Sequence, residues 1–460
     1  MFHHLIVKLN SSWKHLRSQL GRPIILFIFL SMVCITLSGF FLVNGRAQES
    51  LSIIKEKKQN KLIFPRTGTL TRLTNLCIHD RLNEVSHPPS ISSDGRLIAF
   101  LAFNAVDNSD DMGKIFLFDR NNGKIRSIIN GYTHPSAPLI SSDGHVMVFQ
   151  SEVNDLTEGK PHNISNIFLY NNQTGAIERI SQAIDGTPAN DNSYAAALST
   201  NGRFVVFQSK ANNLVPGASN NEWNIYLKDR DMGSMQLISN TSDGKPGNHN
   251  SYHPSISADG RFIVFSSQAS NLTSADRNNY QDIFMYDNKN KETRLISTGL
   301  DDQPANGDSL QPTISANGRF IVFASYASNL VEKDENGVMD VFVYDIIESK
   351  MSLVSKASDG KQGNFISDRP SISTDGRYIV FESLADTLAS GDDNQNWDVY
   401  LHDYLTGSTE RISSTQNGVA GDDLSDLSVI SNDGTTILFQ SFATNLAGSS
   451  PAFYLYQNNR

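Results

Sequence analysis

The sequence predicts an all-β fold, a seven-bladed β-propeller built from four-stranded blades. Three observations support this prediction. One segment recurs in seven near-copies, most copies are 58 residues apart, and each copy carries four strand signals. A unit of this kind cannot bury its faces without neighbours on both sides, which is typical of a propeller blade. Seven copies therefore predict seven blades.

The clearest copy of the repeat is PSISADGRFIVFSSQASNL, from Pro254 to Leu272. Residues 255–257 predict a short first strand, and residues 261–266 predict a second strand. Asp259-Gly260 between them favours a tight hairpin, because the pair tolerates the positive φ angles of such turns. The second strand is apolar on both faces, so we expect it to lie between two packed layers.

The other two strands follow in each copy. Residues 282–287 (DIFMYD) predict the third strand, and residues 293–297 predict a fourth, which is the most polar, as an outer edge should be. The spacing between turn glycines is 49 residues once and 58 residues five times, and these glycines are Gly95, Gly144, Gly202, Gly260, Gly318, Gly376 and Gly434.

The seventh copy has no fourth strand of its own, because the sequence ends four residues after its third strand signal at residues 453–456. At the other end, residues 67–74 (TGTLTRLT) match the fourth strand of the second copy, residues 174–181 (TGAIERIS). We expect this N-terminal strand to close the ring as the outer strand of the seventh blade, which removes an open sheet edge.

Residues 1–23 are basic without an acidic residue, and residues 24–43 (IILFIFLSMVCITLSGFFLV) are almost wholly apolar. Twenty apolar residues are long enough for one helix that spans a bilayer, with the basic flank on the cytoplasmic side. Residues 24–43 are predicted to be an uncleaved transmembrane anchor or a signal peptide core, with the small residues Gly45 and Ala47 marking the cleavage site of the second alternative. Residues 44–66 read as a polar tether before the propeller of residues 67–460.

This leader predicts export across a membrane, or secretion if the leader is cleaved. Together with the repeat resemblance described below, it implies the bacterial cell envelope, on the periplasmic or extracellular side of the inner membrane. The formal charge of the whole chain is −10, but residues 67–460 hold 28 basic and 46 acidic residues, a charge of −18. Such an acidic body repels phosphate backbones, so we expect no nucleic-acid partner.

The Ser-x-Asp-Gly-Arg-x-x-x-Phe hairpin followed by Asp-Ile-Phe-x-Tyr-Asp resembles the TolB-type, WD-like propeller repeat of bacterial envelope proteins. The resemblance covers residues 67–460, and it is specific for architecture because the motif occurs seven times. It does not specify a function, since fold alone does not give function. Seven copies and a short tether differ from TolB itself, whose ring resembles six blades with a separate N-terminal domain. The long repeats are similar to a 58-residue subgroup found in secreted bacterial proteins.

A unit of 58 residues exceeds the roughly 40 residues of compact WD-type blades, and the excess lies in loops. The second-to-third loops, such as residues 266–281, and the fourth-to-first loops, such as residues 297–312, emerge at one end of the ring. We call this end the long-loop face, and we expect a protein or glycan partner to dock there. Trp223 and Trp397 precede third strands on it and either stack on a sugar or pack against a neighbouring loop.

Three second-to-third loops place oxygen-bearing side chains at positions 1, 3 and 7, a pattern that suits calcium. The alternative is structural, because Asp and Asn also cap turns through backbone N–H groups. Both interpretations stay open for the nine residues Asp276, Asn278, Asp282, Asp334, Asn336, Asp340, Asp392, Asn394 and Asp398.

No motif of a serine hydrolase, zinc protease or phosphate-binding loop occurs in the sequence. The sequence therefore favours a binding or scaffold module without catalytic residues. The alternative is a polysaccharide-acting hydrolase or lyase with an acidic central cleft, which needs blade-specific acids, His or Arg at the mouth of the channel.

Overall fold

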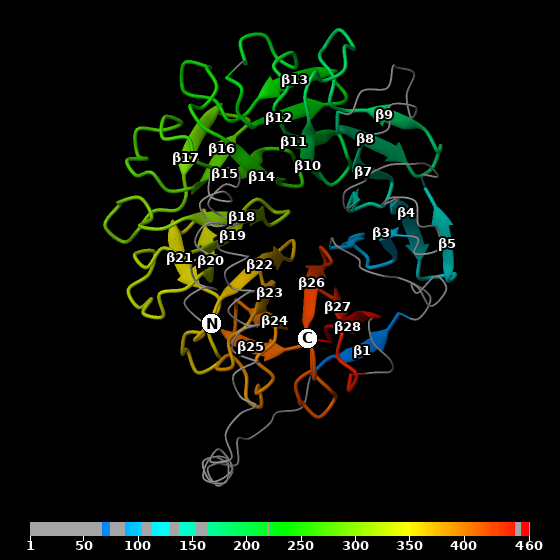
Figure 1. The fold of residues 1–460 in the computed structure, drawn as a ribbon, viewed down its shortest axis with the longest axis vertical. Coiled ribbons are helices and arrows are strands. Elements are labelled where there is room, and N and C mark those ends of the chain that lie inside the picture. Colours follow the sequence, from blue (N-terminus) through cyan, green and yellow to red (C-terminus); the bar gives the residue numbers. More distant parts are fainter. Residues whose placement is uncertain are drawn as a thin grey trace, which may run out of the picture. The chain divides into compact units, whose positions relative to one another are not determined.

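The structure is a computed structural model that describes residues 67–73, 88–103, 113–128, 138–152, 164–218, 220–446 and 452–459. These residues form seven antiparallel sheets of four strands each, and no helix occurs among them (Figure 1). The prediction of a seven-bladed, all-β propeller is confirmed. The apolar segment 24–43 lies outside the described residues, and within them no helix is long and apolar enough to cross a membrane.

The strands of each blade are given from the inner to the outer strand. Blade one consists of β2 (Ser90–Ile91), β3 (Leu97–Phe103), β4 (Gly113–Asp119) and β5 (Lys124–Ser127). Blade two consists of β6 (Leu139–Ile140), β7 (Val146–Ser151), β8 (Asn166–Asn171) and β9 (Ile177–Arg179), and blade three consists of β10 (Ser193–Leu198), β11 (Phe204–Ser209), β12 (Asn224–Asp229) and β13 (Ser234–Leu237).

Blade four consists of β14 (Ser251–Ile256), β15 (Phe262–Ser267), β16 (Asp282–Asp287) and β17 (Glu292–Leu295), and blade five consists of β18 (Ser309–Ile314), β19 (Phe320–Ser325), β20 (Asp340–Asp345) and β21 (Lys350–Leu353). Blade six consists of β22 (Ser367–Ile372), β23 (Tyr378–Ser383), β24 (Asp398–Asp403) and β25 (Ser408–Arg411). Blade seven consists of β26 (Ser425–Ile430), β27 (Thr436–Ser441), β28 (Ala452–Gln457) and β1 (Thr69–Arg72).

The first strand of each blade faces the central axis. Each of these strands contacts the first strand of the next blade, and β26 of blade seven contacts β2 of blade one. Figure 1 shows the inner strands β10, β14, β18, β22 and β26 around the centre, with the fourth strands on the outside. The ring is therefore closed by packing all the way round.

The N-terminal strand closes the seventh blade as predicted. β1 pairs with β28 in an antiparallel register in which Thr69 lies opposite Gln457 and Arg72 lies opposite Tyr454. The backbone N–H of Leu73 extends this ladder by donating to the carbonyl of Phe453, at 2.9 Å. Because both ends of the described ring meet in one sheet, the outer edge of blade seven is supplied from the start of the chain.

The second strands fill the space between blades. In β15, Ile263 and Phe265 pack with residues of blade three, whereas Val264 packs with residues of blade five. The expectation that this strand lies between two packed layers is confirmed. The turn glycine before it is held tightly, because a Cβ at Gly260, whose φ is +74°, would lie only 2.1 Å from the Phe204 ring of blade three.

The first strands of blades three to seven are longer than predicted. β14 begins at Ser251 rather than at Ser255, so four residues assigned to the fourth-to-first loop belong to the sheet. Its pairing with β15 shifts register between Tyr252 and Ser255, and His253 inside the shift has a φ of +50°. This β-bulge interrupts the alternation that the sequence prediction relied on.

Candidate functional site

The same bulge occurs in the first strands of blades three to seven. In each, one non-glycine residue has a positive φ between 48° and 52°, and these residues are 58 positions apart: Ala195, His253, Gln311, Arg369 and Leu427. Positive φ is uncommon for such residues and costs about 1–3 kcal/mol. Bulges also re-aim side chains next to functional sites. The first strands surround the axis, so these five bulges form a circle around the centre of the ring.

Repeating and non-repeating residues alternate at these bulges. A buried Ser pair recurs unchanged in all five blades, as in Ser367 and Ser383, whose hydroxyl oxygens are 2.9 Å apart. The next residue pair differs in every blade, and its members are Tyr194 with Gln208, Tyr252 with Ser266, Leu310 with Ala324, Asp368 with Glu382, and Asp426 with Gln440. The Ser pair is therefore the same in all five blades, whereas the residue pair next to it differs from blade to blade.

The charged members of this circle gather in blades six and seven. Arg369 Nη1 lies 3.2 Å from Glu382 Oε2, and the Glu382 side chain is only 2% exposed. Glu382 Oε1 accepts a hydrogen bond from the backbone N–H of Ser428 in blade seven, at 2.9 Å. Glu382 therefore joins two first strands across the boundary between blades.

Two further carboxyls lie beside this ion pair. Asp368 Oδ1 and Asp426 Oδ1 are both buried, and neither accepts a hydrogen bond from the protein. Burial raises the pKa of Asp368 to about 6, and it raises the pKa of Asp426 as well. Burial also raises the pKa of Glu382 to about 7, against the opposing effects of Arg369 and the Ser428 N–H. Three carboxyls thus share one guanidinium.

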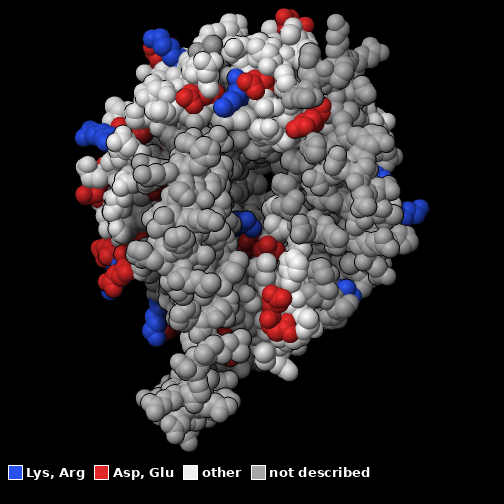
Figure 2. Space-filling model, viewed as in Figure 1, with Lys and Arg blue, Asp and Glu red and all other residues white. Residues whose placement is uncertain are grey.

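Figure 2 shows acidic and basic side chains together at the hollowed centre of the ring. In the sequence, Glu382 is the penultimate residue of β23, directly before a second-to-third loop. The cluster therefore lies at the end of the first strands that belongs to the long-loop face. We call Asp368, Arg369, Glu382 and Asp426 the mouth cluster.

The opposite side of this circle is aromatic. The rings of Tyr194 and Trp223 are 5.1 Å apart, and Lys210 Nζ lies 5.4 Å from the centroid of the Trp223 ring. Trp223 thus packs against β10, the first strand of its own blade, rather than against the neighbouring loop that the structural alternative named. A contact between Trp223 and a sugar stays a prediction.

The three predicted calcium loops share one structural interaction. Asp282, Asp340 and Asp398 each begin a third strand, and each accepts a hydrogen bond through Oδ1 from a serine hydroxyl at the end of the fourth strand, namely Ser297, Ser355 and Ser413. The same serines also accept from the backbone N–H after each aspartate. One carboxylate oxygen of each aspartate therefore has a structural role in the hairpin.

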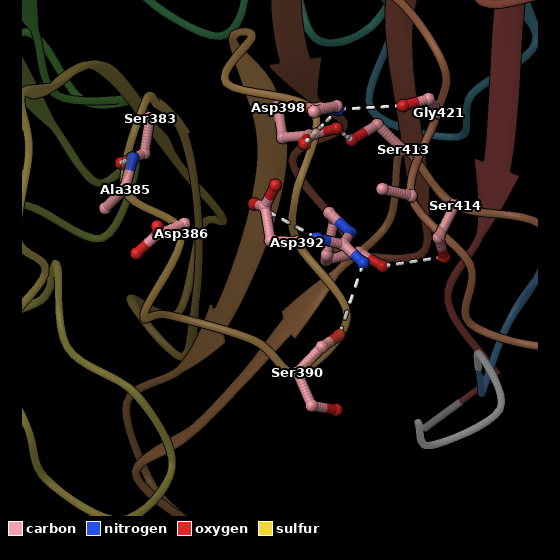
Figure 3. A network of polar contacts seen from close by, with 12 residues as sticks. Ser383, Ala385, Asp386, Ser390, Asp392, Asp398, Ser413, Ser414 and Gly421 are labelled. Carbon is pink, nitrogen blue, oxygen red and sulfur yellow. Dashed lines mark hydrogen bonds and ion pairs between the residues drawn. The ribbon is translucent and has the colours of Figure 1, made fainter. Parts of the chain in front are cut away.

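In blade six, a guanidinium neutralises the carboxylates. Arg411 Nη1 lies 3.0 Å from Asp392 Oδ2, and both side chains are almost fully buried. Asn394 Nδ2 donates to Asp398 Oδ2, at 3.0 Å. Burial raises the pKa of Asp398, while the charge of Arg411 opposes that rise. Figure 3 shows Asp392 and Asp398 within this network, with Ser413 bonded to Asp398.

In blade five, an amide bridges the carboxylates. Gln362 Nε2 donates to both Asp334 Oδ1 and Asp340 Oδ2, each at 2.8 Å. Asn336 Nδ2 donates to the same Asp340 oxygen, at 2.6 Å. Burial raises the pKa of Asp340 to about 6, and these donors limit the rise.

Blade four has neither a guanidinium nor a glutamine amide beside its carboxylates. The positions equivalent to Arg411 and Gln362 are Leu295 and Pro304, 116 and 58 residues earlier in the repeat. Asp282 is fully buried, and its Oδ2 accepts no hydrogen bond from the protein. Burial raises the pKa of Asp282 to about 7, and the nearby charge of Asp276 adds to this effect.

Asn278 does not fill this gap. Its side-chain amide interacts with Asp282 and lowers the pKa of that carboxyl, but the amide lies closer to the carbonyl of Ala305, to which it donates at 2.9 Å. The equivalent Asn336 and Asn394 donate both to their aspartate and to the corresponding carbonyl. Its Oδ1 accepts from the backbone N–H of Tyr280, at 2.8 Å. Asp276 Oδ1 accepts from the N–H of Asn278, at 3.2 Å.

Calcium binding therefore stays a prediction for all nine loop residues, with unequal support. The structure brings each Asp, Asn and Asp set together, as the spacing suggested. Among the described residues, however, no group of three or more His, Cys, Asp or Glu side chains is arranged to hold a metal ion. Blades five and six supply internal donors to their carboxylates, whereas blade four supplies none to Asp282 Oδ2.

Sequence reasoning did not single out the mouth cluster. The bulges were hidden because the residues before Ser255 were assigned to a loop. A signal was nevertheless present in the repeat alignment, because Glu382 stands where other blades have Gln, Ser, Ala or Leu, between two residues that hardly vary. A residue that differs from its equivalents in the other repeats, at a position flanked by repeated residues, therefore indicates a candidate site.

Comparison with known proteins places the chain among propellers. No protein-family model matches it, and no curated protein matches it. It is similar to an oligogalacturonate lyase in complex with manganese (TM-score 0.52, 14% identity, covering 86% of this chain and 97% of that chain). It is equally similar to the β-propeller domain of the Trilobed protease from Pyrococcus furiosus (TM-score 0.52, 12% identity, 81% and 94% covered).

The chain shares its propeller fold with these proteins. TolB from Acinetobacter baumannii is also among the similar structures (TM-score 0.41, 16% identity, 69% of this chain covered). The match spans 63% of the length of that TolB chain. These identities are low, so the similarity concerns the fold alone.

Proposed function

We propose that this chain is an exported, membrane-tethered binding module of the cell envelope, which binds a protein or a glycan at the long-loop face. The observation that carries the proposal is the circle of five bulges, in which repeated serines alternate with blade-specific side chains. A purely structural ring has no need to vary one residue pair in every blade. Rigid scaffolds commonly bind ligands through such variable positions.

The two sides of the circle offer different chemistry to one ligand. The mouth cluster presents carboxyls and one partly exposed guanidinium, whereas Tyr194 and Trp223 present aromatic faces on the other side. A ligand that combines hydrogen-bonding or cationic groups with an apolar face suits this surface. Both a protein loop and a sugar chain meet that description, and the acidic body of the propeller disfavours nucleic acid.

The proposal is tested by exchanging residues between blades. Asp368→Leu with Glu382→Ala gives blade six the residue pair of blade five, which the same bulge accommodates there. The full-length variant and the wild type are compared on a glycan array and in capture of partners from envelope fractions. We expect the variant to stay folded and to lose the ligands that the wild type retains.

The matched control is Ile347→Ser, because Ile347 is 69% exposed in a third-to-fourth turn at the other end of the ring. Retention of every ligand by the Asp368→Leu, Glu382→Ala variant would contradict binding at the mouth cluster. Loss of the same ligands in the control would show that the capture reports general surface change.

A second candidate function is a polysaccharide-acting lyase or hydrolase. It is favoured by one observation, the convergence of blade-specific acids and an arginine at the centre, with the pKa of Glu382 near 7. A carboxyl with such a pKa suits proton transfer at neutral pH. One propeller of similar fold is an oligogalacturonate lyase in complex with manganese. The mouth cluster itself offers no arrangement of three metal-ligating side chains among the described residues.

Catalysis is separated from binding by incubating the chain with uronate-containing and neutral polysaccharides. A lyase forms unsaturated products that absorb ultraviolet light, and a hydrolase releases reducing ends. If the chain is an enzyme, Glu382→Gln abolishes product formation while substrate binding persists. If no polysaccharide is cleaved but ligands are retained through the mouth cluster, the binding module is supported.

A further inference from the structure

The carboxylate pairs of blades four, five and six occupy the same position in the repeat but have different partners. In blade six the partner is a cation, the guanidinium of Arg411, at 3.0 Å from Asp392. In blade five it is the amide of Gln362, which donates to both carboxylates of the pair. In each case the group between the two aspartates supplies positive charge or N–H donors.

Blade four keeps the two aspartates but has Leu295 and Pro304 at the positions of those partners. Asp282 Oδ1 is bonded to the Ser297 hydroxyl, as in the other blades, so its Oδ2 faces the same gap that Gln362 fills in blade five. This oxygen is fully buried without a protein donor, and Asp276 is also buried beside it. A buried carboxylate without a partner is costly, since its lost hydration is not replaced.

We propose that Asp276 and Asp282 of blade four bind a divalent cation, and that calcium is the ion they fit. The ion takes the place of the Arg411 guanidinium and the Gln362 amide in the neighbouring blades. The donors are oxygens only, with no Cys or His, which is the preference of hard cations. Water molecules complete the coordination, because two carboxylates supply fewer than the six to eight oxygens that calcium takes.

The small number of protein ligands sets the expected affinity. Calcium sites in extracellular modules have dissociation constants of roughly 10⁻⁴ to 10⁻³ M, and a site with two carboxylates belongs in that range. Magnesium holds its water more tightly and demands stricter geometry, so we expect it to compete weakly. The site is separate from the mouth cluster, so its existence does not depend on the proposed binding function.

The experiment exchanges the partner residues between blades in the full-length protein. Pro304→Gln gives blade four the bridging amide of blade five, and Gln362→Pro removes that amide from blade five. Pro304 and Gln362 form the same isolated β-bridge in their blades, so the backbone accommodates either residue. Calcium binding is measured by isothermal titration and by equilibrium dialysis after removal of bound metal with EDTA.

We expect one calcium ion per wild-type chain and none per Pro304→Gln chain. We expect a second, weaker ion per Gln362→Pro chain, because Asn336 still donates to Asp340 Oδ2 in that variant. Asp282→Asn, which keeps the size of the side chain, should also abolish binding. Calcium binding that persists in both Pro304→Gln and Asp282→Asn, or that is absent from the wild type at millimolar calcium, overturns the proposal. If Pro304→Gln does not fold by circular dichroism, the Asp282→Asn titration decides.

Discussion

Blades four and six contain the same Asp, Asn and Asp pattern, yet the carboxylates of the two blades have different partners in the structure. In blade six, Arg411 reaches Asp392, and the pair is buried with its charges compensated. In blade four, Leu295 occupies the position of Arg411, and Asp282 Oδ2 accepts no hydrogen bond from the protein. A repeated acidic motif therefore fixes where carboxylates lie, while residues far away in the sequence decide whether they are neutralised internally.

The largest effect is expected when blade six loses its guanidinium. Arg411→Leu introduces the residue found at this position in blades three to five, and it leaves two buried carboxylates without compensation. Removal of one partner of a buried ion pair costs about 3–5 kcal/mol. We expect the free energy of unfolding in urea to fall by that amount.

Blade three supplies the control for this variant. It has Ala218, Asn224 and Leu237 where blade six has Asp392, Asp398 and Arg411. The triple variant Arg411→Leu, Asp392→Ala, Asp398→Asn should therefore recover most of the lost stability. A triple variant no more stable than Arg411→Leu alone would show that the arginine acts through packing and not through charge.

A smaller effect is expected when blade five is converted to the state of blade four. Gln362→Pro removes the donor to Asp334 Oδ1, whereas Asp340 Oδ2 keeps its hydrogen bond from Asn336. An unsatisfied buried acceptor costs about 1–3 kcal/mol. We expect this loss in thermal unfolding with EDTA present, and partial recovery in millimolar calcium. The control is Lys361→Ala, since the exposed Lys361 contacts only Asp359 at the surface. Equal losses in the two variants would contradict a specific role of the amide.

The most gradual effect concerns pH in the absence of divalent cations, because it accumulates over several pH units. The folded protein holds a proton on Asp282 up to about pH 7, whereas the unfolded chain releases it near 3.8. The unfolded state therefore binds fewer protons between these values, and stability falls as pH rises through that window. Asp282 contributes at most about 1.4 kcal/mol per pH unit.

Asp282→Asn should remove this part of the pH dependence, and the measurement is urea unfolding at several pH values with EDTA. Asp340 and Glu382 also have raised pKa values, so the wild type and the variant are compared as a difference in slope. Parallel curves for the two proteins would mean that Asp282 is ionised in blade four, with another group compensating it.

Much of the fold could be predicted from patterns that repeat along the sequence. The 58-residue period, the doubly apolar second strand and the match of residues 67–74 to a fourth strand were enough to predict seven blades and their closure. These features are repeated in the sequence and depend on neighbours in the chain. The first strands were predicted too short, because a bulge at His253 breaks the period of two on which strand recognition depends.

The candidate sites could be predicted from the sequence only in part. The spacing singled out Asp276, Asn278 and Asp282, which interact with one another in the structure, and their role in metal binding stays a prediction. It gave no information about Gln362 and Arg411, which approach the loops of their blades from the fourth strand or the loop after it. The mouth cluster depends on contacts between adjacent blades, such as that of Glu382 with Ser428, and no local pattern records them.

The closing strand also determines how the ring bears mechanical load. β1 is short and half exposed, and it is held to the rest of the propeller mainly by one antiparallel ladder with β28. A pull on the chain before Thr67 reaches this strand before any other. Thr67 binds Glu410 of blade six through two hydrogen bonds of 2.6 Å, so part of the force passes to the adjacent blade. Detachment of β1 would open blade seven at its outer edge while the inner strands still encircle the axis.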